Sequence, residues 1–415
     1  MNLPIRILGQ LGYKNLQFIE KIFPNLQQLK FTRIDDFYEL LICYKTYKKM
    51  LVNSHLKLLL CYRLMGTVFQ PKKVVYHMMA IINRIYRVLN PLPNSGVLVP
   101  RLITRRCFNH ISTKSIKFHE IYPIMATGTS SCHIWQIKSD NTYELVSSLQ
   151  NSMDIKSFIS VAFHPKLPLL ATGTSYGIVM LAKFNIDGTN AKILNTTTIN
   201  KGEIWSIVFH PNLPIVYVSN DYGYLMVLKF TYDYSNLLDI SLLRPHEATI
   251  NGIAIQRNGR FLATCSDDYT AKISTFESDE CKQIKTIVTF TTYRKILCID
   301  IHPTLDLIVF GSDDKSAKIW QINEDFTTTC IKTFHHPAGV RCVQFDPYNW
   351  NIITGCYDGN VRIWNFEDEE KVKKPIHIFR KSPSIYSSVL SIGFSPNRPR
   401  IFAIGNNEIT ICKLE

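Results

Sequence analysis

The sequence predicts an all-β propeller of seven blades, preceded by a small α-helical N-terminal domain. A repeat of about 45 residues fills residues 116–415, and each copy contains short alternating strands separated by turn residues. Residues 1–90 instead have apolar positions at helical spacing. We therefore expect a basic helical region at 1–90, a linker at 91–97 and the propeller at 98–415.

The repeat is defined by a hydrophobic residue that closes the first strand of each copy. Its seven positions are Phe118, Phe163, Phe209, Ile255, Ile301, Phe345 and Phe394, at intervals of 45, 46, 46, 46, 44 and 49 residues. A proline follows two residues later in most copies and lies in a turn such as FHPKLP or IHPTLD. Four short strands per copy, joined by such turns, are the signature of a propeller blade.

The two ends of the repeat region predict how the ring closes. The last copy ends with a third strand, ITICKLE, and is one strand short of a full blade. Residues 98–107, LVPRLITRRC, can supply the missing outer strand. Pairing these two segments would remove an exposed edge and seal the ring.

Two segments resemble the signature of the WD-repeat family: SDDKSAKIW, which ends at Trp320, and YDGNVRIW, which ends at Trp364. In that family a His, a Ser or Thr, an Asp and the Trp form a hydrogen-bonded tetrad within a blade. The resemblance places a complete tetrad in the sixth copy, at His336, Thr354, Asp358 and Trp364.

The other copies are degenerate. The fourth keeps His246, Thr264 and Asp268 but has Ser274 in place of the tryptophan. The fifth keeps its Asp and Trp, with Phe310 at the hydroxyl position. The strand pattern and spacing persist where the tetrad is lost, so the fold prediction does not depend on it.

Charge separates the chain into a basic head and a balanced body. Residues 1–110 contain 17 Lys and Arg against 4 acids, which gives +13 of the total +14, while the remaining 305 residues hold 30 basic and 29 acidic side chains. The eleven cysteines form no C-x-x-C pair and no cluster with histidines. They predict reduced thiols, no zinc, and an intracellular location that is cytoplasmic or nuclear.

The basic head contains two segments with the periodicity of amphipathic helices, residues 35–49 and 72–89. Parts of it resemble an F-box: NLPIRILGQLGYKNL is similar to the opening of that motif, and IDDFYELLICYKTYKK to its second half, with a longer gap between them. This resemblance implies a cullin-ligase adaptor as partner of residues 1–90. Binding to nucleic acid, to an anionic membrane or to an acidic protein, or a purely solvated helical cap, are the alternatives.

No catalytic residues, cofactor-binding residues or metal ligands are predicted. The recurrence of His164, His210 and His302 is explained by the repeat, because all three occupy the same place in the FHP-type turn. The chain has no G-x-x-x-x-G-K-[ST], H-E-x-x-H, G-x-S-x-G or G-x-G-x-x-G motif. Binding, without catalysis and without a cofactor, is the function class that remains.

Repeat position predicts which residues reach the narrow face around the central channel. They are Glu203, Trp205, Asn251, Asp267, Lys295, Asp313, Arg341 and Tyr357. Trp205 is either a contact for a partner or a side chain packed between blades. The sequence thus predicts a non-catalytic protein–protein interaction scaffold with a protein partner of unknown identity. An F-box-like substrate receptor of a ubiquitin ligase, and a nucleic-acid or membrane tether acting through the head, are the alternatives.

Overall fold

The computed structural model describes residues 100–107, 112–139, 142–150, 157–199, 202–276, 283–323, 325–347, 349–367, 374–380, 388–395, 401–405 and 408–414. The chain divides into two units, Met1–Gly96 and Val97–Glu415, and all described residues belong to the second. The predicted helical region at 1–90, its F-box resemblance and the linker at 91–97 lie outside the described residues. Within the described residues every regular element is a strand.

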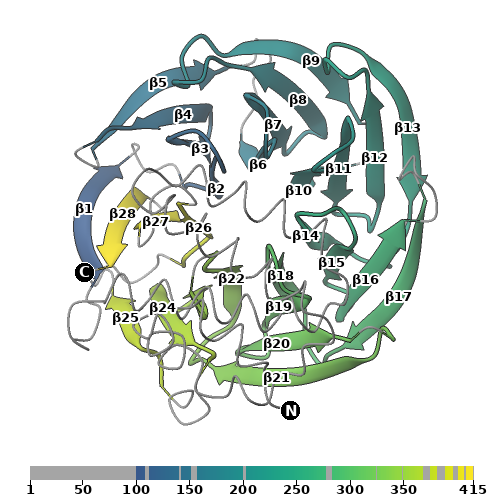
Figure 1. Cartoon of the computed structure of the whole chain (residues 1–415), viewed down its shortest axis with the longest axis vertical. Helices are drawn as coiled ribbons and strands as arrows, with labels where there is room; N and C mark the ends of the chain where they lie inside the picture. The colour runs from purple at the N-terminus through teal and green to yellow at the C-terminus, as the bar shows by residue number, and fades with distance from the viewer. Residues whose placement is uncertain are drawn as a thin grey trace, which may run out of the picture. The chain divides into compact units, whose positions relative to one another are not determined.

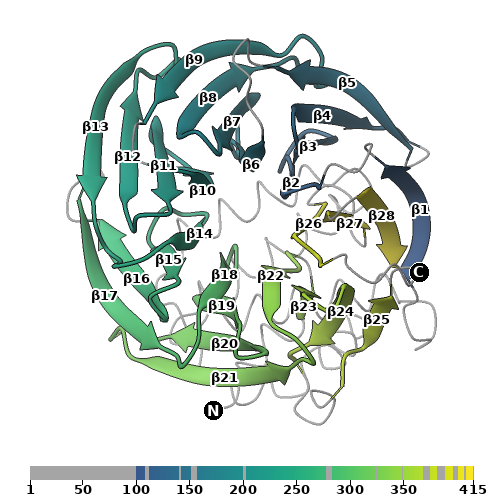
Figure 2. The same ribbon diagram turned by 180° about the vertical axis from the view of Figure 1, so that it is seen from behind.

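The strands form seven antiparallel sheets of four, arranged around a common axis (Figures 1 and 2). The predicted seven-bladed all-β propeller is therefore confirmed. Blades are numbered 1–7 along the chain, and in each the first strand lies nearest the axis. Blade 1 comprises β2 (Ser115–Phe118), β3 (Ile124–Gly128), β4 (Cys132–Ile137) and β5 (Tyr143–Leu149). Blade 2 comprises β6 (Phe158–Phe163), β7 (Leu169–Thr174), β8 (Ile178–Lys183) and β9 (Lys192–Thr198). Blade 3 comprises β10 (Ile204–Phe209), β11 (Ile215–Asn220), β12 (Leu225–Phe230) and β13 (Leu237–Leu243).

The next three blades repeat this order. Blade 4 comprises β14 (Ile250–Ile255), β15 (Leu262–Ser266), β16 (Thr270–Phe276) and β17 (Ile284–Thr291). Blade 5 comprises β18 (Ile296–Ile301), β19 (Leu307–Ser312), β20 (Ser316–Ile322) and β21 (Thr328–His335). Blade 6 comprises β22 (Val340–Phe345), β23 (Asn351–Cys356), β24 (Asn360–Asn365) and β25 (His377–Arg380).

Blade 7 combines strands from both ends of the described chain. It contains β26 (Ser391–Phe394), β27 (Ile401–Gly405), β28 (Glu408–Leu414) and, as its outer strand, β1 (Pro100–Cys107). β1 and β28 are antiparallel, with Pro100 opposite Leu414 and Cys107 opposite Glu408. This pairing completes blade 7 from the two ends of the described chain, and β1 and β28 lie side by side in Figure 1.

Burial explains why the strands of one blade differ in sequence. The second strands of blades 1 to 6 are buried at every position, and they consist of apolar and small residues, as in LIVFGS of β19. Outer strands are more exposed and mix polar with apolar residues, as in β17, IKTIVTFT. The repeat therefore sets a buried interior strand and a more exposed outer strand in each blade.

The hydrophobic core is divided into seven clusters, each between two neighbouring blades. The cluster between blades 2 and 3, for example, packs Val179 and Leu181 of β8 against Ile204 and Ile207 of β10. The cluster between blades 7 and 1 packs Ile411 of β28 with Trp135 and other residues of blade 1. Each blade thus depends on its neighbours for a core, which is typical of a repeat architecture.

Side-chain hydrogen bonds also join the innermost strands around the axis. The third residue before each repeat-defining hydrophobic position is Ser115, Ser160, Ser206, Gly252, Cys298, Cys342 or Ser391. Each serine hydroxyl accepts a hydrogen bond from a backbone amide of the next blade, at 2.9 to 3.3 Å. The thiols of blades 5 and 6 lie 3.6 and 3.8 Å from the carbonyls of Val340 and Val389. A small polar residue at this repeat position therefore ties neighbouring blades together.

Candidate functional site

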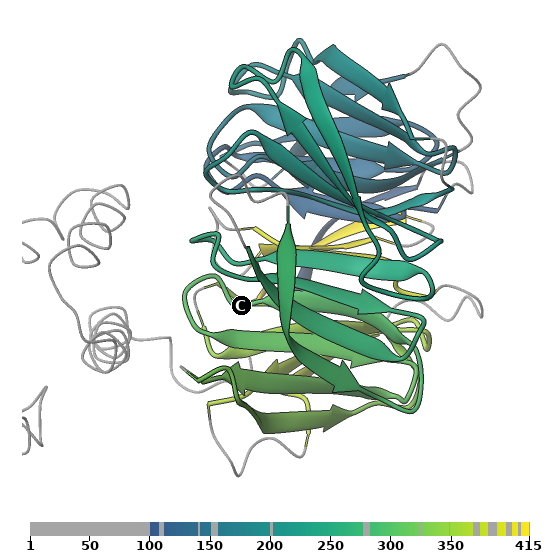
Figure 3. The ribbon, with the colours of Figure 1, turned by 90° about the vertical axis from the view of Figure 1, so that its right-hand side faces the viewer.

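The loops of each blade divide between two faces of the ring, seen edge-on in Figure 3. The channel face is defined here by two sets of loops: those between the second and third strands of each blade, and those that lead into each first strand. Backbone hydrogen bonds join the two sets, for example Asp267 N to Thr249 O at 3.0 Å and Asp313 N to Lys295 O at 3.0 Å. All eight residues predicted for the narrow face lie in these loops or at the adjoining start of a first strand.

Trp205 and Arg341 contact each other from opposite sides of the ring axis. They occupy the second position of the first strand in blades 3 and 6. The Arg341 guanidinium carbon lies 5.7 Å from the centre of the Trp205 ring, within the range of a cation–π contact, and its Nη1 donates to Leu297 O at 3.2 Å. The indole Nε1 of Trp205 is buried and has no hydrogen-bond partner among the described residues. Trp205 therefore contacts a side chain across the axis.

Asp267, Lys295 and Asn251 form a second group on the channel face. The Lys295 Nζ lies 2.6 Å from one carboxylate oxygen of Asp267, and Asn251 Nδ2 donates to the other at 2.7 Å. The same Asn251 amide donates to Ile296 O in the next blade at 2.9 Å. The hydrogen bond and charge of Asp267 raise the pKa of Lys295. The Asp267 carboxylate is thus held in place by blades 4 and 5 together.

Asp313 of blade 5 and Tyr357 of blade 6 lie on either side of Gly339, in the loop that leads into β22. A Cβ at Gly339 would lie 2.7 Å from Asp313 Oδ1 and 2.9 Å from Tyr357 Cδ2, so a larger residue there would displace these side chains. Burial raises the pKa of Tyr357, and Arg341 opposes that rise. Glu203 contributes its backbone amide, which donates to Asp221 Oδ1 at 3.1 Å. The predicted residues therefore form several separate groups and not one pocket.

Five exposed tyrosines lie on the channel face, and sequence reasoning selected only one of them. They are Tyr176, Tyr222, Tyr269, Tyr293 and Tyr357, each at least 45% exposed. Four occupy the turn between second and third strands, and Tyr293 precedes β18. The signal was present in the repeat, since Tyr176 and Tyr222 stand in the same turn position of successive copies.

The turns that present these tyrosines share one backbone conformation. The positive φ position recurs at Gly177, Gly223, Tyr269, Lys315 and Gly359, with φ between 67° and 81°. Three blades place glycine there, which tolerates this conformation, whereas Tyr269 and Lys315 adopt it at a steric cost. Tyr269 is therefore fixed in the channel face by the turn itself.

The tetrad predicted in the sixth blade is wrong at one of its four members. Trp364 Nε1 donates to Thr354 Oγ1 at 3.0 Å, and Thr354 Oγ1 lies 2.9 Å from His336 Nε2. His336 Nδ1 donates to the carbonyl of Phe334 at 3.1 Å, not to Asp358. The Asp358 carboxylate pairs with the buried guanidinium of Arg362. Burial, together with the charge of Arg362, lowers the pKa of His336 to about 4.

The fourth blade forms the carboxylate–imidazole link that the sixth lacks. His246 Nδ1 lies 2.9 Å from Asp268 Oδ2, and His246 Nε2 lies 2.8 Å from Thr264 Oγ1. Burial raises the pKa of Asp268, but the hydrogen bonds from His246 and Thr270 outweigh it and hold that pKa well below its usual range. Ser274, at the tryptophan position, lies near Thr286 on β17.

A basic residue four places after the turn aspartate explains the difference between blades. Arg362 in blade 6 and Lys318 in blade 5 both reach back to the aspartate of their own blade. Lys272 in blade 4 donates instead to the carbonyl of Pro245. The Asp268 carboxylate is therefore available to bond with the imidazole of His246. A charged guanidinium competes better than a neutral imidazole for a carboxylate, so Arg362 displaces His336.

The FHP-type histidines are structural. His164 Nδ1 accepts from the amides of Lys166 and Leu167 at 3.1 and 3.0 Å, and His119, His210 and His302 repeat this arrangement. Burial lowers the pKa of each to about 4, so each is neutral at pH 7. Among the described residues no three His, Cys, Asp or Glu side chains are grouped as metal ligands.

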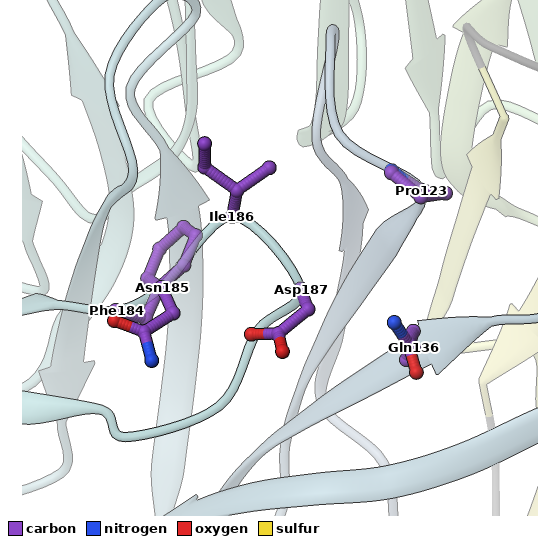
Figure 4. Close-up of a pocket in the computed structure, with 6 residues that line it drawn as sticks. All are labelled: Pro123, Gln136, Phe184, Asn185, Ile186 and Asp187. Carbon is purple, nitrogen blue, oxygen red and sulfur yellow. The ribbon is translucent and has the colours of Figure 1, made fainter.

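A shallow pocket on the opposite face is the other candidate site. It is lined by Pro123, Gln136, Phe184, Asn185, Ile186 and Asp187, which come from blade 1 and from the loop after β8 (Figure 4). Its carboxylate, Asp187, already accepts from the amide and hydroxyl of Thr189, at 3.0 and 2.7 Å. The pocket therefore offers apolar contact and no reactive group. In the described part of the chain, no helix could span a bilayer.

Comparison with known proteins identifies the repeat. The family model "WD domain, G-beta repeat" matches residues 239–273, 282–321 and 328–365. Each match begins with an outer strand, β13, β17 or β21, and continues through the first three strands of the next blade. The matched segments are WD repeats within the seven-bladed propeller, as the sequence motifs predicted.

Curated relatives resemble this chain over part of their length. A guanine nucleotide-binding protein subunit beta-like protein of Encephalitozoon cuniculi is 27% identical over 31% of this chain and 38% of its own. The transcription initiation factor TFIID subunit 5 of Caenorhabditis elegans is 29% identical over 28% of this chain and 17% of its own. The protein transport protein sec13 of Emericella nidulans is 28% identical over 32% of this chain and 46% of its own. In each case the match spans less than half of the relative.

Proposed function

We propose that the chain is a non-catalytic scaffold that binds another protein through the channel face. The observation that carries this proposal is the concentration of Tyr176, Tyr222, Tyr269, Tyr293 and Tyr357 on that face. Tyrosine combines a large apolar ring with a polar end and loses little conformational entropy on binding, so it is enriched in protein interfaces. Five such rings around one channel mouth suit an extended protein segment.

The charges of the channel face also support a protein partner. Lys295 and Arg341 are its central cations, and both are engaged, by Asp267 and by Trp205 respectively. Nucleic-acid binding by this face would need free cations aligned for phosphates. Paired charges between exposed tyrosines instead fit the polar and aromatic surface of a protein interface.

The relatives support the same class of function. Two of the three relatives described above are named as subunits, and the third as a protein transport protein. We also propose an intracellular location, cytoplasmic or nuclear. Seven of the described cysteines are free thiols and five of these are buried, which suits a reducing compartment. The F-box and tether alternatives concern residues 1–90 and stay predictions.

Affinity capture with matched variants of the full chain tests the proposal. The first variant combines Tyr222→Ala, Tyr269→Ala and Tyr357→Ala. The control combines Ile186→Ala, Tyr232→Ala and Phe326→Ala, which removes exposed side chains from loops between third and fourth strands on the opposite face. We expect the first variant to lose the proteins that the wild type captures and the control to retain them.

Two results would contradict the channel-face proposal. In one, both variants retain the same proteins as the wild type, and in the other, only the control loses them. If the retained material is a cullin adaptor or a nucleic acid, the function belongs to residues 1–90 and the predicted alternatives replace the proposal.

A further inference from the structure

The outer strand of blade 3, β13, is an exposed edge with an unusual sequence. β13 is hydrogen-bonded to β12 on one side and is the last strand of its sheet. Its exposed positions alternate and are all aliphatic: Leu238 is 59% exposed, Ile240 41% and Leu242 46%. Edge strands normally carry charged residues or proline that prevent pairing with another chain. β13 has no proline, and its one charged residue, Asp239, is not among its exposed positions.

The corresponding strands of neighbouring blades differ. Ile240 pairs with Leu228 in β12, and 46 residues later Thr286 pairs with Ser274 in β16. Blades 1 and 2 each have a single exposed aliphatic residue in the outer strand, Leu145 and Ile193. Among the described strands, three exposed aliphatic residues in alternation are a property of β13 alone. The feature therefore belongs to one place on the rim and not to the repeat.

The sequence of β13 is nearly palindromic. It is LLDISLL, which is the same in both directions about Ile240 except for Asp239 and Ser241. In an antiparallel pair of identical strands, a two-fold axis at Ile240 places Leu238 opposite Leu242 and Leu237 opposite Leu243. A two-fold interface requires such self-complementarity, because each residue must fit its symmetry partner on the same surface.

Charge is compatible with that register. Asp239 of one copy would lie opposite Ser241 of the other, so the two carboxylates do not oppose each other. Arg244 follows one end of the strand, and Asp233 lies in the loop before the other end. The two-fold axis brings Arg244 of each copy towards the loop that carries Asp233 of its partner. Within its own copy Arg244 also pairs with Glu247, and Asp233 accepts from the hydroxyls of Thr231 and Ser235, so the charges at both ends are compatible with the pairing.

We propose that the protein forms a two-fold symmetric homodimer in which β13 pairs antiparallel with β13 of a second copy. The two four-stranded sheets of blade 3 become one continuous sheet of eight strands. The pairing satisfies the free backbone groups of both edges and covers the exposed Leu and Ile side chains. It uses the rim, so it is independent of the channel face and of the proposed function.

Sedimentation equilibrium of the full chain tests the dimer. Over about 1 to 100 µM, where an interface of modest size associates, we expect the mass to rise from 47.9 kDa towards twice that value. Ile240→Lys should keep the chain monomeric throughout, because it places a charge at the centre of the paired edge. Thr286→Lys, at the corresponding position of blade 4, should associate like the wild type. Circular dichroism checks that both variants fold.

Two outcomes would overturn the proposal. One is a wild type that sediments as a monomer at every concentration, and the other is an Ile240→Lys variant that associates as the wild type does. Oxidative cross-linking tests the register separately, since residues directly opposite each other have Cβ atoms about 4.5–5.5 Å apart. Ile240→Cys should give a covalent dimer well above the level of the wild type and of Thr286→Cys, and equal levels would refute pairing about Ile240.

Discussion

The hydroxyl of Thr354 offers a sharp test of how the blades are held together. It accepts a hydrogen bond from Trp364 Nε1 at 3.0 Å and donates one to His336 Nε2 at 2.9 Å. Thr354→Val keeps the shape of the side chain but leaves the buried indole N–H and imidazole nitrogen unpaired. An unsatisfied buried polar group costs about 1–3 kcal/mol, so we expect a loss of about 2–4 kcal/mol in the free energy of unfolding.

Thr172 provides the matched control. It occupies the same position in the second strand of blade 2, it is buried, and its hydroxyl has no hydrogen-bond partner among the described residues. Thr172→Val removes a buried hydroxyl that makes no bond, so stability should stay equal or rise by about 1 kcal/mol. Urea unfolding of both full-length variants gives the difference from the transition midpoints at constant m. Equal destabilisation by the two substitutions would refute the assignment of the Thr354 network.

Further predictions concern pH, closure and the blade 6 ion pair. The pKa of His210, like those of the other FHP-type histidines, is lowered from 6.5 to about 4. The unfolded chain therefore takes up protons first, and stability should be full above pH 6.5 and fall as the pH drops towards 4. His210→Asn keeps an acceptor for the turn amides and should reduce the slope of unfolding free energy against pH; an unchanged slope would contradict the neutral buried imidazole. Replacing residues 98–107 by a Gly-Ser linker of equal length should lower the melting temperature and increase light scattering, because β28 loses its partner. An unchanged melting curve would count against closure by β1. Arg362→Leu should free the Asp358 carboxylate, which keeps contact with solvent, and lower stability by about 1–3 kcal/mol, between the costs of breaking an exposed and a buried ion pair, as measured by urea unfolding. A change below about 1 kcal/mol would show that the pair is dispensable.

The fold could be predicted from the sequence because each blade repeats a local pattern. A hydrophobic residue, a turn and a buried second strand recur at nearly constant spacing, and short-range chemistry determines each of them. The serines that tie the blades together were also visible in that alignment, three places before the hydrophobic position. Their role as hydrogen-bond acceptors between blades could not be predicted, because a serine that is exposed on a strand has the same sequence pattern.

The partners of individual side chains could not be predicted in the same way. The motif suggested that Asp358 pairs with His336. In the structure the Asp358 carboxylate instead pairs with the guanidinium of Arg362, which lies four residues further along the chain. The hydrogen bond from Trp135 to Thr127 in blade 1 was missed because the turn of that copy lacks the aspartate of the motif. Both cases depend on which neighbour lies nearest, and spacing alone does not contain that information.

The channel face shows the same limit. Repeat position predicted Asn251, Asp267 and Lys295 for one face, and the structure brings these three side chains into one hydrogen-bonded group. The contact between Trp205 and Arg341 joins blades on opposite sides of the axis. Only the closed ring brings those two residues together, so no local pattern could have indicated it.

Photo-cross-linking from single positions of the full chain tests the channel face most directly. A photoreactive phenylalanine analogue replaces Tyr222 or Tyr357 on the channel face, or Tyr232 on the opposite face as a control of equal chemistry. The proposed scaffold predicts that a captured protein becomes cross-linked from positions 222 and 357 and not from 232. Cross-linking from position 232 alone would place the partner on the opposite face and contradict the proposed function.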